Sequence, residues 1–202
     1  MALFGTEYGK LGDERLMELV VQGDERAFAA LYDRYNRRVL NYFYRMLWSD
    51  REMAQDYLQD LFTKLATRPQ SYDPSRPFQT WLFSVANNMC KNAYRHQAVV
   101  KEAAIHLRNG VDRVEATHGI GVDRERFRDR LDEELDKMDP DHKATFVMRF
   151  NEDMAIKEIA AVFACSEGTV KSRIFYTLKK LAERMKEFDP KTLQHHGTAR
   201  TI

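Results

Sequence analysis

Apolar residues recur every three or four positions along almost the whole chain, and no stretch keeps the alternation of apolar and polar residues that is typical of a half-buried strand. This period constrains the fold strongly, because a repeat of 3.6 residues places apolar side chains on one face of a helix. A helix with one apolar face is stable only when that face packs against other elements. We therefore predict an all-α fold.

The first part of the chain, residues 13–97, is expected to form a bundle of four helices. Asp13, Asp24 and Asp50 precede the first three apolar stripes. Aspartate is favoured at a helix N-terminus because its carboxylate accepts bonds from free backbone N–H groups. Gly23 is expected to end the first helix, since glycine readily adopts the left-handed conformation found there.

A loop precedes the fourth helix of this bundle. Prolines at positions 69, 74 and 77 exclude a continuous helix from Thr67 to Pro77. The fourth helix is expected to begin near Phe78 and to end near Gln97. Trp81 follows the spacing of the apolar stripe in this helix, which favours a core position over an exposed one.

The second part of the chain, residues 129–188, is expected to form another small bundle. Asp139-Pro140 predicts a helix start, because proline is tolerated at the first helical position. Residues 98–128 carry three glycines and few large apolar residues, so we expect a linker there, and partial helix within it stays open. Residues 1–12 and 189–202 are expected to be tails. The sequence thus predicts two small helical domains joined by a flexible linker.

Residues 154–181 predict two short helices joined by a tight turn. Ser166 stands where the second helix should be capped. The apolar stripe of this second helix consists of Val170, Ile174, Leu178 and Leu181. Its outer face is expected to carry polar, basic and aromatic side chains, namely Ser172, Tyr176 and Lys179, flanked by Lys171, Arg173 and Phe175. Such a helix suits the major groove of DNA, and the alternative is an ordinary helix with a solvated charged face.

The charge pattern limits the classes of partner. The net charge is only +1 at pH 7, so no overall positive field marks a nucleic-acid binder. The charge is segregated instead: residues 167–187 hold six Lys/Arg against three Asp/Glu, and residues 129–141 hold seven acids against two bases. Such blocks can present one surface to nucleic acid and another to a protein, or they can be solvated helix faces.

Other residue types exclude several functions. Cys90 and Cys165 lie far apart without a CxxC spacing, so we expect two small buried side chains and neither a zinc site nor a disulfide. No apolar run is long enough to span a membrane, and the first residues hold no apolar run preceded by basic residues, so we expect a cytoplasmic protein. The histidines are scattered, and neither a nucleophile pattern nor a phosphate-binding glycine loop occurs. We therefore expect no catalytic residues, no metal, no cofactor and no enzymatic activity.

Four motifs then occur in the order typical of a known family. They are AFAALYDRY at 27–35, MAQDYLQDLFTKL at 53–65, FQTWLFSVANNMCKNAYR at 78–95 and KEIAAVFACSEGTVKSRI at 157–174. Over nearly all of residues 24–186 the chain resembles the extracytoplasmic-function (ECF) RNA polymerase sigma factors of the sigma-70 family. The resemblance implies that the first bundle is sigma region 2, which docks on core RNA polymerase and melts and reads the minus-ten element. The second bundle would be sigma region 4, a helix-turn-helix that reads the minus-thirty-five element.

The resemblance also implies partners, namely the β′ clamp helices and the β flap of core RNA polymerase, promoter DNA and an anti-sigma factor. The clamp helices would bind the helix at 53–65. Asp56, Gln59 and Asp60 share one exposed face of that helix by their spacing. A stripe of acidic and amide groups is a sensible complement to a basic coiled coil.

The DNA contacts implied by the resemblance fall on two segments. Promoter melting needs aromatic faces, polar groups and positive charge, and the residues implied for the minus-ten element are Tyr72, Ser75, Arg76, Asn87, Asn88, Lys91, Asn92 and Arg95. Those implied for the minus-thirty-five element are Thr169, Lys171, Ser172, Arg173, Tyr176 and Lys179. Arg173 is the best single candidate for direct contact, because arginine can pair with guanine through two hydrogen bonds.

The sequence departs from the family pattern at several of these positions. Asn87 and Asn92 stand where the family often has arginine and aspartate, which leaves the minus-ten sequence undetermined. Ala155 replaces the usual capping serine. Ala164 replaces the turn glycine, at a cost in strain if its conformation is left-handed. The segment Tyr176–Leu178 replaces a basic Arg-Ala-Arg sequence, so the minus-thirty-five sequence is also undetermined.

A stand-alone helix-turn-helix regulator of the LuxR type is an alternative, although only the last third of the chain fits it. Polymerase dependence separates the two functions. A regulator binds duplex DNA by itself, whereas a sigma factor binds weakly until it joins the core enzyme.

Overall fold

The computed structural model describes residues 8–105 and 123–188, and these residues form helices and turns without a strand. The elements are α2 (Asp13–Val21), α3 (Glu25–Met46), α4 (Arg51–Thr67), the short 3-10 helix η1 (Pro69–Ser71), α5 (Phe78–Ile105), α6 (Asp123–Asp136), α7 (Pro140–Phe150), α8 (Ile156–Phe163), α9 (Glu167–Arg184) and η2 (Lys186–Phe188). The all-α prediction is confirmed. None of the described helices is both long enough and apolar enough to cross a bilayer.

Side chains cap four helices where the sequence predicts their starts. The Asp24 carboxylate accepts bonds from the backbone N–H groups of Arg26 and Ala27 at 2.9 and 3.1 Å. The side chains of Asp50, Asp139 and Ser166 also accept hydrogen bonds from backbone N–H groups of the helices that follow them, at distances of 2.9 to 3.1 Å. These bonds satisfy backbone donors that would otherwise have no partner within the helix.

Asp13 does not cap α2, so the prediction for this residue was wrong. Gly12 occupies the N-cap position, without a side-chain bond. The Asp13 carboxylate instead accepts hydrogen bonds from the Arg34 guanidinium and the Tyr35 hydroxyl, both on α3. This choice depends on donors more than twenty positions away, so local spacing could not reveal it.

The fourth helix extends beyond the end near Gln97 that the sequence predicts, into the expected linker. Helix α5 continues past Gln97 to Ile105, and α6 begins at Asp123. Both ends of the expected linker, 98–128, are therefore helical. Residues 106–122, the expected tail 189–202 and the first seven residues of the chain lie outside the described ranges.

The first bundle is built around α3. Tyr42 and Phe43 of this helix have no exposed surface, and the Tyr42 ring packs edge-on against Phe83 of α5 at 5.5 Å between centroids. Trp81 is buried, as its spacing predicts, with 9% of its surface exposed. Cys90 is fully buried, also as predicted, and burial raises the pKa of its thiol. Cys165 is half-buried.

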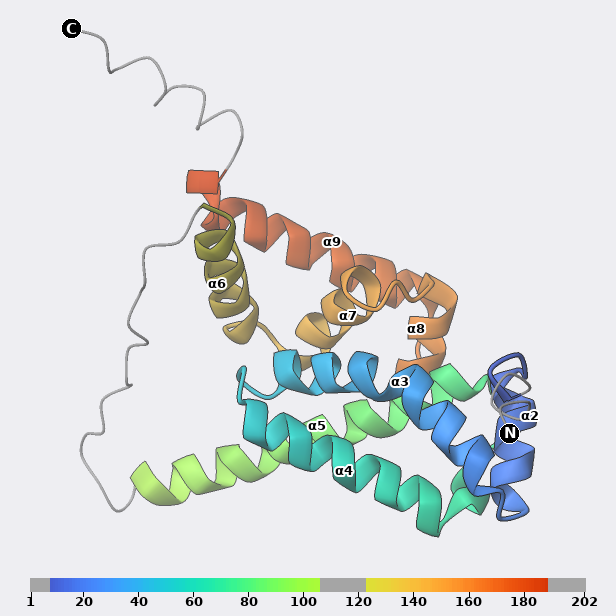
Figure 1. Ribbon diagram of the computed structural model, residues 1–202. Helices are drawn as coiled ribbons and strands as arrows, with labels where there is room; N and C mark the ends of the chain where they lie inside the picture. The colour runs from blue at the N-terminus through green and yellow to red at the C-terminus, as the bar shows by residue number, and fades with distance from the viewer. Residues whose placement is uncertain (1–7, 106–122, 189–202) are drawn as a thin grey trace, which may run out of the picture.

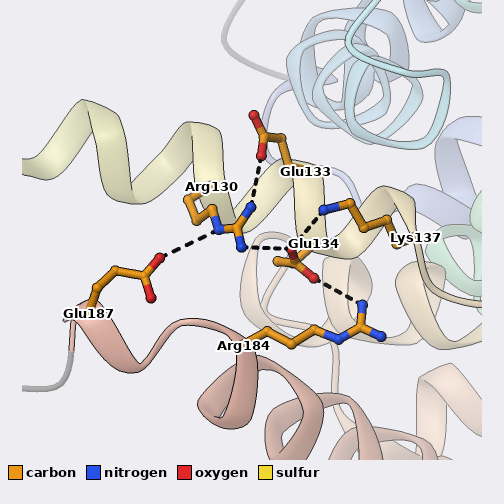
Figure 2. A network of polar contacts seen from close by, with 6 residues as sticks. All are labelled: Arg130, Glu133, Glu134, Lys137, Arg184 and Glu187. Carbon is orange, nitrogen blue, oxygen red and sulfur yellow. Dashed lines mark hydrogen bonds and ion pairs between the residues drawn. The ribbon is translucent and has the colours of Figure 1, made fainter.

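Helix α6 is fixed to the end of α9 by a small apolar cluster and by ion pairs. Leu135, Met138, Phe146, Leu181 and Met185 form the cluster. Beside it, the Glu134 carboxylate is almost fully buried and contacts Arg130 of its own helix, Lys137 directly after that helix and Arg184 of α9 (Figure 2). A buried carboxylate needs such partners, because the loss of hydration is costly.

The two predicted bundles are both present, and they pack against each other. In Figure 1, α7 lies over α3, and α8 descends beside α5. The buried residues of α7 and α8, among them Val147, Met148 and Ile159, belong to the same continuous apolar core as those of α3 and α5. The pattern of apolar stripes predicted each bundle but did not predict this shared core.

Candidate nucleic-acid interface

The turn between α8 and α9 holds the two helices of the predicted helix-turn-helix at a fixed angle. Ala164 adopts the left-handed conformation, with φ 49° and ψ 44°, which costs an alanine about 1–2 kcal/mol. At the other end of α8, Ala155 has no side-chain acceptor, but its backbone N–H donates to the Glu158 carboxylate at 2.7 Å. Glu158 thus supplies one half of a capping box, while the other half, a side-chain acceptor at position 155 for the N–H of the third helical residue, is missing.

Most of the residues predicted for the outer face of α9 do lie on it. The exposed ones are Thr169, Lys171, Ser172, Phe175, Tyr176 and Lys179. The rings of Phe175 and Tyr176 pack edge-on at 5.4 Å, with 62% and 55% of their surfaces exposed. This face combines hydroxyls, ammonium groups and aromatic surface, which are the groups that can read base edges and thymine methyls in a major groove.

The apolar stripe of α9 differs from its prediction at one position. Leu178 was expected inside, but 44% of its surface is exposed. Thr177 is fully buried in its place, and its hydroxyl lies 3.2 Å from Nδ1 of His142 on α7. A threonine can be buried here because α7 supplies a polar partner, which helical spacing alone does not show.

Arg173, the strongest sequence candidate for a DNA contact, points toward the protein. One of its Nη atoms donates to the Asp141 carboxylate at 2.9 Å, and its guanidinium lies over the Phe163 ring at 4.9 Å from the centroid. Only 20% of the side chain is exposed. In this conformation Arg173 joins α9 to α7 and α8 and does not extend toward solvent.

The residues predicted for the minus-ten element divide into exposed, paired and buried groups. Ser75, Asn88, Asn92 and Arg95 are exposed. Arg76 and Lys91 are half-buried, because Arg76 donates to the backbone oxygen of Ala161 at 3.0 Å and Lys91 pairs with Asp141 at 2.9 Å. Both partners belong to the second half of the chain, which lies against the loop before α5 and against the middle of α5.

Two further residues of this set face inward. The Asn87 amide oxygen accepts a hydrogen bond from the Tyr42 hydroxyl at 3.0 Å, and Asn87 is 3% exposed. Tyr72 is 8% exposed, packs against Phe78 and Trp81, and donates its hydroxyl proton to the backbone oxygen of Arg76 at 2.8 Å. In this conformation neither Asn87 nor the Tyr72 ring is accessible to an unpaired base.

The predicted polymerase-docking face lies on α4. Asp56, Gln59 and Asp60 are all exposed, as their spacing requires. Next to them, a groove of about 680 Å³ runs between α3 and α4, and its apolar lining includes Phe28, Tyr32, Leu40, Leu58 and Phe62. This face therefore offers charged and amide groups beside an apolar groove, as protein interfaces do.

The sequence did not single out Asp141 and Phe163 as parts of a site. Asp141 accepts from Lys91 on α5 and from Arg173 on α9, while Phe163 lies within 5.5 Å of both cations. The local sequence shows only that Asp141 lies in the first turn of α7, where an acidic side chain interacts favourably with the helix dipole. That position does not predict the contacts of Asp141 with Lys91 and Arg173.

Comparisons with known proteins agree with this architecture. Residues 31–99 match the family "Sigma-70 region 2", and residues 128–181 match "Sigma-70, region 4". The ECF RNA polymerase sigma-E factor of Haemophilus influenzae is 30% identical over 175 residues, which cover 82% of this chain and 91% of that protein. The RNA polymerase sigma-H factor of Pseudomonas aeruginosa is 28% identical over 171 residues, with coverage of 81% and 88%.

Solved structures show the same fold. CnrH in complex with the cytosolic domain of CnrY matches with a TM-score of 0.65, at 24% identity, over 88% of this chain and 99% of that one. The sigma factor RpoE from Bartonella quintana, in complex with the anti-sigma factor NepR, matches with a TM-score of 0.63 at 17% identity, over 80% of this chain and 98% of that one. From the matched regions and relatives, the chain belongs to the ECF family of RNA polymerase sigma factors, the proteins that direct core RNA polymerase to promoters.

Proposed function

We propose that this sigma factor uses three surfaces to initiate transcription. The exposed face of α4 docks on the β′ clamp helices of core RNA polymerase, and the second bundle contacts the β flap. The segment from Ser75 to Arg95 contacts the minus-ten element. The outer face of α9 reads the minus-thirty-five element.

The observation that carries this proposal is the outer face of α9. Five of the six residues predicted to contact DNA there are exposed on one rigid helix that follows a tight turn. Lysines for phosphate and hydroxyl or aromatic groups for base edges therefore lie together on that helix. Arg173 is the sixth residue, and it faces inward, where it contacts Asp141 of α7 and Phe163 of α8.

Run-off transcription with core RNA polymerase and a library of promoter sequences tests this function. We expect transcripts from a defined subset of sequences that share two elements. Duplex binding by the free chain should be much weaker than binding by its complex with core polymerase. Strong, sequence-specific binding without core polymerase, together with no transcript, would favour the alternative of a stand-alone regulator.

The docking face is tested separately by a pull-down of core RNA polymerase. Asp56→Arg and Gln59→Ala should reduce the amount of core enzyme retained, because Asp56→Arg places positive charge against a basic coiled coil. Asp33→Arg is the matched control, since Asp33 is an exposed aspartate on α3. Equal retention by Asp56→Arg and wild type would contradict the assignment of α4.

An anti-sigma factor is the proposed regulator of this chain. Both solved relatives described above are bound to a second protein, which for the Bartonella quintana protein is named an anti-sigma factor. In this chain, the groove between α3 and α4 adjoins the polymerase-docking face. A protein bound in that groove would compete with core polymerase for this chain. We therefore expect that an inhibitor, identified by its effect on run-off transcription, is displaced by excess core enzyme.

A further inference from the structure

Helix α5 begins without a cap from its own segment of the chain. Its first residue is Phe78, and Pro77 before it has no side-chain acceptor. The nearest preceding side chains with acceptor oxygens bond with each other, since the Asp73 carboxylate accepts from the Ser75 backbone N–H at 3.0 Å and from the Ser75 hydroxyl at 2.7 Å. The first turn of α5 also holds no acidic residue. The free N–H groups at this helix start therefore need an acceptor from elsewhere.

Glu14 of α2 supplies this acceptor, although it lies 64 positions earlier in the chain. Its Oε1 accepts a hydrogen bond from the Phe78 backbone N–H at 3.2 Å. A carboxylate at this place also interacts favourably with the positive end of the helix dipole. Glu14 thus caps a helix to which it does not belong.

Helix α2 is itself anchored in the first bundle, so the Glu14 carboxylate has a fixed place. The side chains of Leu16 and Met17 on the inner face of α2 have no exposed surface. The Asp13 carboxylate accepts hydrogen bonds from Arg34 and Tyr35 of α3. The two adjacent acids of α2 therefore join different helices, because Asp13 binds α3 and Glu14 binds the start of α5.

The residue that Glu14 caps also supports the loop before α5. The Phe78 ring packs edge-on against Tyr72 of this loop, with 5.7 Å between the ring centroids. Tyr72 in turn donates its hydroxyl proton to the backbone oxygen of Arg76 at 2.8 Å. Helix α2 also packs against η1, the short helix at the start of the loop. Both ends of the loop thus contact α2 or the residue that α2 caps, while Ser75 between them is exposed.

We propose that Glu14 is a positioning residue for promoter melting: its carboxylate fixes the first turn of α5 and, through Phe78, the loop that presents Ser75 and Arg76 to the minus-ten element. This role rests on the function proposed above, because it requires minus-ten contacts within residues 75–95. Glu14 itself touches no DNA. It holds the loop in shape before the unpaired strand binds, so less ordering is needed on binding. Without the cap, fewer molecules hold the binding conformation, and the affinity falls by that fraction.

Hydrogen exchange of the folded full chain tests the cap directly. The Phe78 amide should exchange about fivefold or more faster in Glu14→Ala than in wild type, because exchange requires this hydrogen bond to open. Glu14→Gln keeps an acceptor oxygen and should retain part of the protection. Glu18→Ala is the matched control, since Glu18 is an exposed glutamate on the same helix. Equal exchange of the Phe78 amide in wild type and Glu14→Ala overturns the proposal.

The role in melting is tested with each variant bound to core RNA polymerase. The probe is a fluorescent single strand that carries the non-template minus-ten sequence of a promoter selected by run-off transcription. Glu14→Ala should weaken binding of this strand by about three- to tenfold and lower the permanganate reactivity of minus-ten thymines in the duplex promoter. Pull-down of core RNA polymerase should stay at the wild-type level. Glu14→Gln should restore most of the affinity for the strand.

Loss of charge and loss of the cap predict opposite changes in DNA binding. Glu14→Ala and Glu18→Ala each remove one negative charge, so electrostatics alone predicts equal and slightly tighter binding for both. If the two variants behave alike, or if Glu14→Ala loses core polymerase as much as it loses the minus-ten strand, the positioning role is refuted. If the wild-type holoenzyme binds no minus-ten strand, the proposed function fails instead, while exchange of the Phe78 amide still decides whether the cap exists.

Discussion

Glu134 provides a sharp test of how α6 is held to the rest of the chain. Its carboxylate is 3% exposed and accepts from Lys137 at 2.8 Å, from Arg184 at 2.9 Å and from Arg130 at 3.2 Å (Figure 2). Glu134→Gln keeps the shape of the side chain and removes its charge. The three cations then face a neutral amide, which cannot attract them as a carboxylate does.

The size of the effect follows from the exposure of the partners. The side chains of Arg130, Lys137 and Arg184 are 36%, 46% and 45% exposed, so water replaces much of the lost interaction. We assign about 0.5 kcal/mol to each contact, which gives a loss of roughly 1–2 kcal/mol in the free energy of unfolding. Glu133→Gln is the matched control: Glu133 is 52% exposed and, among the described residues, forms an ion pair with Arg130 alone, so its loss should stay below about 0.5 kcal/mol.

Urea unfolding of both variants, followed by circular dichroism, measures the difference. The Lys137 ammonium holds the pKa of the Glu134 carboxyl below its ordinary value, and the Arg184 guanidinium adds to this effect. The stabilisation is therefore complete above the pKa of an unfolded glutamate and is lost as the pH falls through the lower pKa of the folded state. Equal losses for Glu133→Gln and Glu134→Gln, or a difference that persists at low pH, would refute the reasoning.

Two further predictions concern stability. Ala164→Gly should raise the free energy of unfolding by about 0.5–1 kcal/mol, because glycine relieves the left-handed strain, whereas Ala161→Gly, an exposed position within α8, should lower it by about 1 kcal/mol. Equal signs for the two changes in urea unfolding would contradict the strain at the turn. Tyr42→Phe should cost about 1–3 kcal/mol, because the buried Asn87 oxygen loses its donor. A change below about 0.5 kcal/mol in the same measurement would mean that this hydrogen bond contributes little.

Helix positions were largely predictable because they depend on local rules. The spacing of apolar residues gave the stripes of α3, α4 and α5, and the caps at Asp24, Asp50 and Ser166 follow from the affinity of oxygen acceptors for free N–H groups. The face of α4 was predictable for the same reason, since residues three and four apart lie on one side of a helix.

Individual side chains near the helix contacts were less predictable. Helical spacing cannot tell whether a polar residue on the border of a stripe turns outward or finds a partner inside. Asn87 turns inward because Tyr42 lies opposite it, and Thr177 does so because His142 is within reach. Arg173 follows the same rule, because Asp141 and Phe163 stand beside it.

The sequence by itself thus determined the all-α class, the two bundles, the recognition helix and the resemblance to sigma factors. Only the tertiary structure decided that the bundles share one core and that Lys91 and Arg173 meet at Asp141. The physical reason is the range of the interactions. Helix formation and capping act within a few residues, whereas the contact between the bundles joins side chains that lie up to 114 positions apart in the chain.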